Sequence, residues 1–141
     1  HVQTKRTLMK EDSIRQIMNA DDHLNVALVG IGTADNTSSA FRSGYYSEEM
    51  KQQAVRDRVC GDICMHLFDK EGRTDCFPYN KQIVGVNLNK LKKVPYAIGI
   101  ANGVRKAEAI RGAIKGGYIN VLVTDAQCGE ALTRLNDELN N

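Results

Sequence analysis

The fold is decided by residues 96–125, which read YAIGIANGVRKAEAIRGAIKGGYINVLVTD. Two short apolar runs, 96–101 and 120–124, flank a segment at 105–115 whose apolar residues recur at helical spacing. The glycine pair at 116–117 is expected to stop that helix, because glycine tolerates the left-handed conformation that commonly follows a helix. A strand, a crossover helix and a second strand predict parallel pairing, and therefore an α/β sheet.

Further elements are predicted on both sides of this unit. The run LNVALV at 24–29 is almost entirely apolar, and such a strand is typical of the centre of a parallel sheet. A final helix is expected at 125–139. Together these elements predict a Rossmann-like α/β fold, with a mainly parallel sheet and helices on both faces.

Local capping and turn residues predict the remaining elements, which are helices at 13–19 and 47–58, a strand at 61–68, a hairpin turn at 69–72 and a strand at 82–86. Ser13 and Ser47 are expected to cap the two helices, and Gly61 to end the second. The strand at 61–68 is predicted from its alternation of apolar and polar side chains.

The composition is that of one ordinary globular domain. The 141 residues are 42% hydrophobic and 26% charged, and no apolar run approaches the roughly 18 residues that a membrane span requires. The net charge of +2 is spread along the chain without a basic face, so any DNA binding must come from outside this chain. Four cysteines without a signal peptide favour reduced thiols and a cytoplasmic location.

The loop after the first strand is a candidate ligand site, because ligands of open α/β sheets bind beyond the carboxyl ends of the strands. It reads Gly30-Ile31-Gly32-Thr33, and its two glycines allow backbone N–H groups to approach a phosphate or a sugar oxygen. A tight turn that needs positive φ at these glycines is the alternative interpretation. A dinucleotide fingerprint is excluded, since G-x-G-x-x-G does not occur.

Two further places have the chemistry of a sugar or phosphate site. Asn102 and Gly103 precede a helix whose first turn contains Arg105 and Lys106, an arrangement that favours an anion, although a solvated basic turn would look the same. Asp62 follows a glycine at the start of the alternating strand, where a carboxylate could accept sugar hydroxyls. An exposed hairpin aspartate is the alternative.

Neither a metal site nor a catalytic group is predicted. Cys60, Cys64 and His66 share one face of the expected strand, but zinc sites normally use closely spaced C-x-x-C pairs on turns. The three histidines offer no recognisable base for a cysteine nucleophile. We therefore expect no catalytic residue, no metal and no cofactor.

Four motifs in order carry a resemblance to a known family. They are LVGIGTAD at 28–35, RSGYYSEEM at 42–50, GDICMHLFDKEGR at 61–73, and VGVNLNKLKKVPYAIGIANGVRKAEAIRGAIKGGYINVLVTDAQCGEAL at 84–132. Together they resemble the sugar-binding effector domain of SorC/DeoR-type bacterial transcription regulators, from about Lys5 to Leu135.

The resemblance implies a fold similar to the sugar-phosphate isomerase and glucosamine-phosphate deaminase group. It also implies that residues 1–141 are the C-terminal part of the effector domain, separate from an N-terminal helix-turn-helix that binds operator DNA. Carried over by motif, the Gly30–Thr33 loop, Asp62 and Lys106 are the expected ligand contacts, and Asn102 and Gly103 hold the place of a common Gly-Gly pair. Asp125 is instead expected to cap the last helix.

The function implied is the sensing of a sugar or sugar phosphate by a cytoplasmic, homo-oligomeric regulator, without enzymatic turnover. The alternative is a sugar-phosphate isomerase or deaminase of the same fold group, with Asp62 and Lys106 as acid and base or Lys106 as a Schiff-base lysine. Neither the sugar nor the target operon can be named from the sequence.

Overall fold

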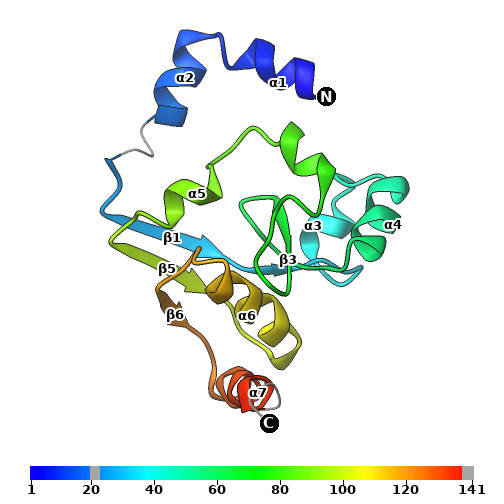
Figure 1. Ribbon diagram of the computed structural model, residues 1–141, viewed down its shortest axis with the longest axis vertical. Helices are drawn as coiled ribbons and strands as arrows, with labels where there is room; N and C mark the ends of the chain where they lie inside the picture. Colours follow the sequence, from blue (N-terminus) through cyan, green and yellow to red (C-terminus); the bar gives the residue numbers. More distant parts are fainter. Residues whose placement is uncertain (20–22, 138–141) are drawn as a thin grey trace.

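The computed structural model describes residues 1–19 and 23–137 (Figure 1). Its helices are α1 (Val2–Leu8), α2 (Asp12–Asn19), α3 (Ser39–Arg42), α4 (Glu48–Arg56), α5 (Leu88–Leu91), α6 (Ala107–Lys115) and α7 (Ala126–Asp137), with 3₁₀ helices η2 (Pro78–Gln82) and η3 (Val104–Lys106). Its strands are β1 (Val26–Gly30), β2 (Gly32–Thr33), β3 (Val59–Ile63), β4 (His66–Asp69), β5 (Tyr96–Ile100) and β6 (Val121–Val123).

The strands form two small sheets that are joined through a single residue. The order β1-β5-β6 makes a parallel sheet, with Leu28 opposite Ile98 and Gly99 opposite Leu122. The order β2-β3-β4 makes an antiparallel sheet. Ile31, which separates β1 from β2, is 1% exposed, so the chain passes from one sheet into the other through the core. The predicted α/β class with a parallel sheet flanked by helices is confirmed.

Helix α6 connects the two sheets. Its buried residues are nearly all small, namely Ala107, Ala109, Ile110, Gly112 and Ala113, and they share one core with the inward side chains of β1 and β5. The same helix contacts β3 and β4 of the antiparallel sheet. A second, smaller core lies under α3 and α4 and is formed by Phe41, Tyr46, Ala54, Leu67 and Phe77. The crossover unit predicted from residues 96–125 is therefore the centre of the fold.

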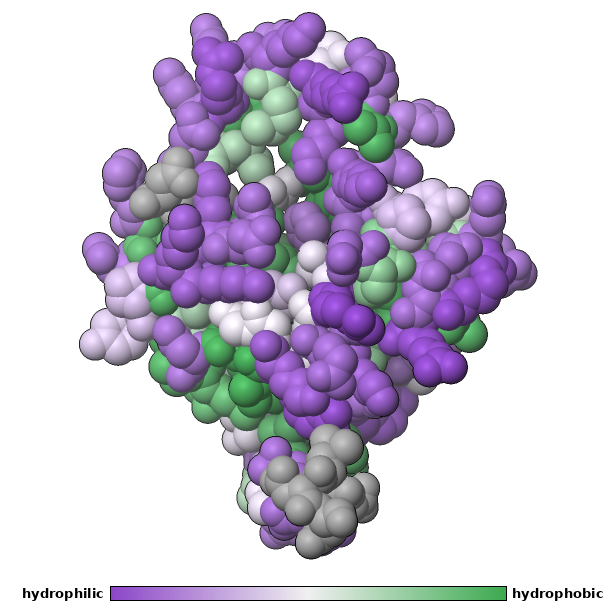
Figure 2. Space-filling model, viewed as in Figure 1, coloured by the Kyte–Doolittle hydropathy of each residue, from purple (hydrophilic) through white to green (hydrophobic). Residues whose placement is uncertain are grey.

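The face of the parallel sheet opposite α6 is apolar and open to solvent. Figure 2 shows hydrophobic side chains gathered over this sheet. Its large exposed residues are Val26, Leu28, Tyr96, Ile100, Val121 and Val123. Within the described residues β1 pairs with β5 alone, so β5 and not β1 is the central strand. The run at 24–29 looks central by composition because the outer side of β1 carries apolar residues too. The prediction that helices also cover this second face of the sheet stays a prediction.

The hairpin is in a different place from the prediction. Residues 61–68 are not one strand: Cys64 and Met65 form a two-residue turn between β3 and β4, with φ of 50° and 67°. Such a turn usually contains Asn and Gly, so neither residue signals it. Gly72 does have the positive φ of a turn, at 76°, but among the described residues β4 pairs with β3 alone, so the turn at 69–72 does not join two strands of a hairpin.

The ends of two helices also differ from the predicted ones. Helix α4 is capped by Ser47 as predicted, with Met50 N donating to Ser47 Oγ at 3.3 Å. It ends at Arg56, because Arg58 adopts φ 54° and turns the chain into β3, within which Gly61 lies. Helix α2 begins at Asp12, so Ser13 lies inside it and does not cap it.

The last third follows the prediction more closely. Helix α6 begins two residues later than expected, after the 3₁₀ turn η3, and Gly117 ends it with φ 70°. The predicted strand at 82–86 is absent, because η2 and an irregular loop occupy that segment. The predicted end of the last helix at residue 139 lies outside the described residues. No helix in the part of the chain that the structure describes is long and apolar enough to cross a bilayer.

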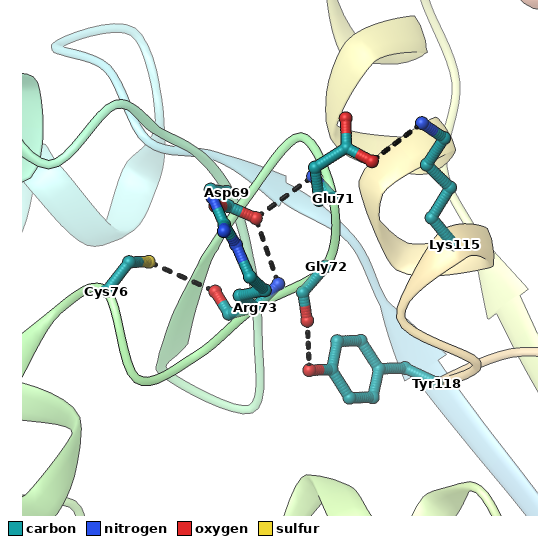
Figure 3. A network of polar contacts seen from close by, with 7 residues as sticks. All are labelled: Asp69, Glu71, Gly72, Arg73, Cys76, Lys115 and Tyr118. Atoms are coloured by element: carbon teal, nitrogen blue, oxygen red, sulfur yellow. Dashed lines mark hydrogen bonds and ion pairs between the residues drawn. The ribbon is translucent and has the colours of Figure 1, made fainter.

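Asp69 ties the end of β4 to the following turn, and residues of that turn contact Lys115 of α6 and Tyr118 (Figure 3). Its carboxylate accepts hydrogen bonds from Glu71 N at 2.9 Å, and from Arg73 N at 2.9 Å and Nε at 2.8 Å. Burial alone would raise the pKa of Asp69, but these hydrogen bonds and the Arg73 charge lower it overall. Tyr118 donates to Gly72 O, and Lys115 binds Glu71 at 2.8 Å, which fixes the turn against α6.

Asn80 completes the outer edge of β4. Its Oδ1 accepts from Leu67 N at 2.9 Å, and its Nδ2 donates to Leu67 O at 2.6 Å and to Thr74 O at 2.7 Å. The side chain therefore acts as one residue of an additional strand, and it satisfies backbone groups that are buried.

Replacing Asn80 should destabilise the fold strongly. Asn80→Ala removes the partner of two buried backbone groups of Leu67 and of the partly buried Thr74 O, and we expect a loss of about 3 kcal/mol in the free energy of unfolding, or about 10 °C in Tm. Chemical denaturation with the exposed Asn89→Ala variant as control measures it. A loss below about 1 kcal/mol, similar to that of the control, would show that water replaces the side chain.

Acid should weaken the fold through Asp69. Because its folded pKa lies below the unfolded value near 3.8, its contribution to stability is complete above about pH 5 and is lost as pH falls through the folded pKa. Denaturation at a series of pH values should therefore show a steeper fall in stability below about pH 4 for the native chain than for Asp69→Asn. Parallel curves would assign the acid sensitivity to other carboxylates.

Candidate ligand-binding site

A cavity of about 530 Å³ opens where β1 leaves the parallel sheet. Its walls come from the loop between β1 and β2, the segment around α3, the β3–β4 hairpin and the end of η3. The lining residues are Gly30, Ile31, Gly32, Ser38, Ser39, Ala40, Ser43, Tyr45, Asp62, Cys64, Met65 and Lys106. Five of the eight predicted contacts, Gly30, Ile31, Gly32, Asp62 and Lys106, thus lie around one cavity.

The two glycines of the loop provide space in two different ways. A Cβ atom added at Gly30 would meet nothing within 4 Å, so the cavity reaches the backbone there. A Cβ atom added at Gly32 would lie 2.0 Å from Asp62 Oδ1, so the missing side chain makes room for that carboxylate. Neither glycine is among the residues with positive φ, so the alternative interpretation of a positive-φ turn is wrong.

Asp62 is held by its neighbours and is partly withdrawn from water. It lies on β3 directly opposite Gly32 of β2. Burial raises the pKa of Asp62, and the hydrogen bond from the Met65 backbone and the positive charge of Lys106 offset this only in part. Such a carboxylate gains from additional hydrogen-bond donors, and the hydroxyl groups of a sugar are donors of this kind.

Lys106 crosses the cavity to the glycine loop. It is the last residue of η3, and its Nζ donates to the carbonyl oxygen of Ile31 at 2.8 Å. The sequence separation of 75 residues explains why only the fold reveals this contact. The ammonium group therefore lies beside the exposed backbone of the loop, where it could neutralise an anion that enters the cavity.

The other predicted contacts lie elsewhere. Thr33 is 6% exposed and faces a separate hollow lined by Asp35, Arg58 and Arg105. Asn102 and Gly103 are exposed but do not line the cavity, and Gly103 N already donates to Asp125 Oδ2 at 2.5 Å. A ligand contact from these residues stays a prediction.

Asp125 has the role of a cap, as expected. Its Oδ1 accepts from Cys128 N at 2.9 Å at the start of α7, while Oδ2 holds the turn at Gly103. Hydrogen bonds from the backbone N–H groups of Gly103 and Cys128 lower the pKa of Asp125.

Sequence reasoning missed half of the cavity wall. The missed polar and aromatic residues are Ser38, Ser39, Ser43 and Tyr45, and the missed turn residues are Cys64 and Met65. A cluster of serines followed by Gly-Tyr-Tyr was the available signal, but residues 42–50 were used only for the family resemblance and no ligand contact was predicted among them. The turn residues could not be placed because their hairpin was not recognised.

The cysteines and histidine considered for a metal are separated by the hairpin. Cys60 lies on β3 and His66 on β4, with Cys64 in the turn between them. Burial, together with the nearby Glu108 charge, raises the pKa of Cys60 to about 12, so its thiol stays protonated at neutral pH. Burial likewise lowers the pKa of His66. Across residues 1–19 and 23–137 no three His, Cys, Asp or Glu side chains gather as a metal site.

The cavity can therefore bind a small polar molecule. It offers a carboxylate, an ammonium group, serine hydroxyls and a backbone that can be approached closely, and it also has apolar surface at Ala40 and Met65. This combination of mixed walls and a few placed polar groups is typical of small-molecule sites.

Known proteins of similar sequence share one description. The model of the family Sugar-bind, a sugar-binding domain, matches residues 1–134. The deoxyribonucleoside regulator of Bacillus subtilis is 35% identical over 91% of this chain and 41% of its own length. The transcriptional regulator LsrR of Escherichia coli O9:H4 is 40% identical over 92% of this chain and 42% of its own length.

Solved structures agree with this description. The full-length sorbitol operon regulator SorC from Klebsiella pneumoniae matches with a TM-score of 0.83 and 32% identity, over 94% of this chain and 43% of that one. A DeoR family transcriptional regulator from Listeria monocytogenes matches with a TM-score of 0.85 and 27% identity, over 93% of this chain and 53% of that one.

The chain spans less than half the length of the curated relatives that it matches. All four of these relatives are described as regulators, two of them as transcriptional regulators, and none of the four as an isomerase or a deaminase. The family model covers nearly the whole chain. The chain therefore belongs to the family of sugar-binding domains found in transcriptional regulators of the SorC and DeoR type.

Proposed function

We propose that this chain binds a phosphorylated sugar in the cavity around Asp62 and Lys106, and that it does so as the C-terminal part of the effector domain of a cytoplasmic, homo-oligomeric regulator. Binding of the sugar would control how an N-terminal helix-turn-helix, outside this chain, engages operator DNA. The convergence of Asp62, Lys106 and the glycine loop on one cavity is the observation that carries the proposal.

The charges of the cavity favour a ligand with both hydroxyl groups and an anion. Asp62 is the carboxylate that accepts sugar hydroxyls, and Ser38 and Ser39 can donate or accept beside it. Lys106 pairs with the phosphate, and for this it exchanges the neutral carbonyl oxygen of Ile31 for a charged partner. The name of one relative refers to a deoxyribonucleoside, which contains a sugar ring, and that name supports a sugar.

Binding without turnover is the simplest use of this cavity. Asp62 is the one acidic and Lys106 the one basic side chain among the lining residues, and they face the ligand from the same region. Acid–base catalysis would need a further group placed to move a proton, and the described lining offers only hydroxyls and the Cys64 thiol. We therefore propose a sensor, and expect a bound sugar phosphate to be recovered unchanged.

Ligand binding can affect the rest of the regulator through the elements that form the cavity. The ligand would bridge the hairpin, through Asp62, and the start of α6, through Lys106. A regulatory effect requires that the sugar bind one arrangement of the oligomer more tightly than another. The open apolar face of the β1-β5-β6 sheet supports the view that more of the regulator packs on this chain, because exposed apolar patches of this kind usually mark an interface.

A sugar phosphate should stabilise the chain through Lys106. With ligand at about 100 times its Kd, mass action adds about 2.7 kcal/mol, or roughly 8–12 °C in Tm. The panel consists of ribose 5-phosphate, deoxyribose 5-phosphate, glucose 6-phosphate, fructose 6-phosphate and sorbitol 6-phosphate, each beside its free sugar. Lys106→Ala should weaken the best ligand by about 10–100-fold, since a hydrogen bond to a charged group is lost.

The matched control for this variant is Lys93→Ala, which removes an exposed lysine that does not line the cavity. It should bind as the native chain does. If Lys106→Ala also retains full affinity, Lys106 does not contact the ligand. If no compound on the panel shifts the native Tm, the sugar-phosphate proposal fails.

Asp62 should trade stability for binding. The folded pKa of Asp62 is raised above the unfolded value near 3.8, so the protonated carboxyl fits the fold better than the ionised one. The free energy of unfolding is therefore highest below about pH 3.8 on account of this group, and it falls as pH rises through the folded pKa of Asp62. Asp62→Asn removes this loss, so the Tm at pH 7 should be unchanged or higher, while the best ligand on the panel binds about 10-fold or more weakly. Calorimetry and thermal melts of the variant measure both; a lower Tm with unaltered affinity would make Asp62 a structural residue.

A further inference from the structure

Tyr45 is a large aromatic side chain at the cavity that no structural role explains. It is 73% exposed and lines the cavity, whereas its neighbour Tyr46 is 3% exposed and belongs to the second core. A single exposed apolar side chain is ordinary on a protein surface. An exposed aromatic ring beside a cavity that also contains a carboxylate and an ammonium group is more informative, because such rings are frequent walls of small-molecule sites.

The position of Tyr45 is fixed although its ring is free of the core. Gly44 has φ 80° and turns the chain after α3. Tyr46 then packs on Phe41, with ring centroids 5.0 Å apart, and its hydroxyl donates to Met65 O at 3.0 Å. Ser47 caps α4 directly afterwards. The backbone at Tyr45 is thus held on both sides, so only the rotamer of the Tyr45 side chain has to become ordered when a ligand binds.

The cavity therefore has two kinds of wall. The residues that carry charge are Asp62 and Lys106, whereas Tyr45, Ala40 and Met65 offer apolar or aromatic surface. The Tyr46–Met65 hydrogen bond joins the segment of Tyr45 to the hairpin that carries Asp62, so the walls keep a fixed relation. A ligand that fits both must be polar at its edge and apolar on a face.

A sugar in its ring form has this shape. Its hydroxyl groups project from the edge of the ring, and its C–H groups form an apolar face on which an aromatic ring can pack. A linear polyol of the same length has no such continuous face. We propose that Tyr45 stacks on the C–H face of the sugar, and that the site selects the ring form of a sugar phosphate over a linear polyol phosphate. This inference rests on the proposed function.

The first test compares variants of Tyr45 by calorimetric titration with the panel member that gives the largest Tm shift. Tyr45→Phe keeps the ring and should bind within about threefold of the native chain, whereas Tyr45→Ala should bind about tenfold or more weakly. Tyr96→Ala is the matched control, since Tyr96 is 60% exposed on the outer face of the sheet and does not line the cavity. Tyr96→Ala should bind as the native chain does.

The second test compares glucose 6-phosphate with sorbitol 6-phosphate, which differ in that only the first can close a ring. We expect the ring-forming compounds of the panel to bind more tightly than sorbitol 6-phosphate, and Tyr45→Ala to reduce that preference. Thermal melts without ligand should give the same Tm for Tyr45→Ala as for the native chain, because the side chain is exposed.

The outcomes separate the two proposals. Three outcomes would each overturn the stacking inference and leave the sugar-phosphate site standing. They are an affinity of Tyr45→Ala equal to that of the native chain, tighter binding of sorbitol 6-phosphate than of the ring-forming compounds, and a Tm of Tyr45→Ala several degrees below the native value. Binding of no panel member to the native chain would overturn both.

Discussion

Helix α6 packs against both sheets through buried residues that are alanine or glycine except for Ile110, and the placement of the other elements depends on this close contact. A Cβ atom at Gly61 of β3 would lie 2.8 Å from Ala109 Cβ, and one at Gly112 would lie 2.9 Å from Asp69 O. Interiors this dense tolerate little added volume. Because α6 packs this closely on β3, its first turn lies beside the glycine loop, and Lys106 reaches Ile31 O.

The same contact explains why the site lies at the junction of the two sheets. The chain leaves the parallel sheet at Gly30 and enters the antiparallel sheet at Gly32, with the buried Ile31 as the only residue between them. Between Gly30 and Gly32 the backbone changes from pairing in the parallel sheet to pairing in the antiparallel sheet. The carbonyl oxygen of Ile31 accepts a hydrogen bond from Lys106 there instead of from a strand. Asp62 can lie against this junction only because Gly32 has no side chain. Backbone, carboxylate and ammonium groups thus meet for reasons of packing.

The parts that could be predicted from the sequence are those with local signals. The unit at 96–125 follows from apolar periodicity and a glycine stop, and Ser47 and Asp125 follow from capping chemistry. The hairpin at Cys64 and Met65 could not be predicted, because its residues are unfavourable for a turn with positive φ and tertiary contacts hold it: Tyr46 binds Met65 O, and Asn80 pairs with β4. Gly30, Asp62 and Lys106 were predicted as contacts, but that they surround one cavity requires the fold.

The departures from ordinary packing are concentrated where a ligand or a further part of the protein is expected. Asp62 is a partly buried carboxylate whose ionised form is disfavoured, and Tyr45 leaves an aromatic ring in water. The apolar outer face of the β1-β5-β6 sheet is a third departure of the same kind. Each is unfavourable for the isolated chain, and each would be relieved by binding: donors for the carboxylate, a C–H face for the ring and a packed layer for the sheet. Ile63 of the hairpin, the buried side of α6 and the inner side of the sheet share one core, and under the proposed function this core is the connection between the ligand site and the packing of that sheet.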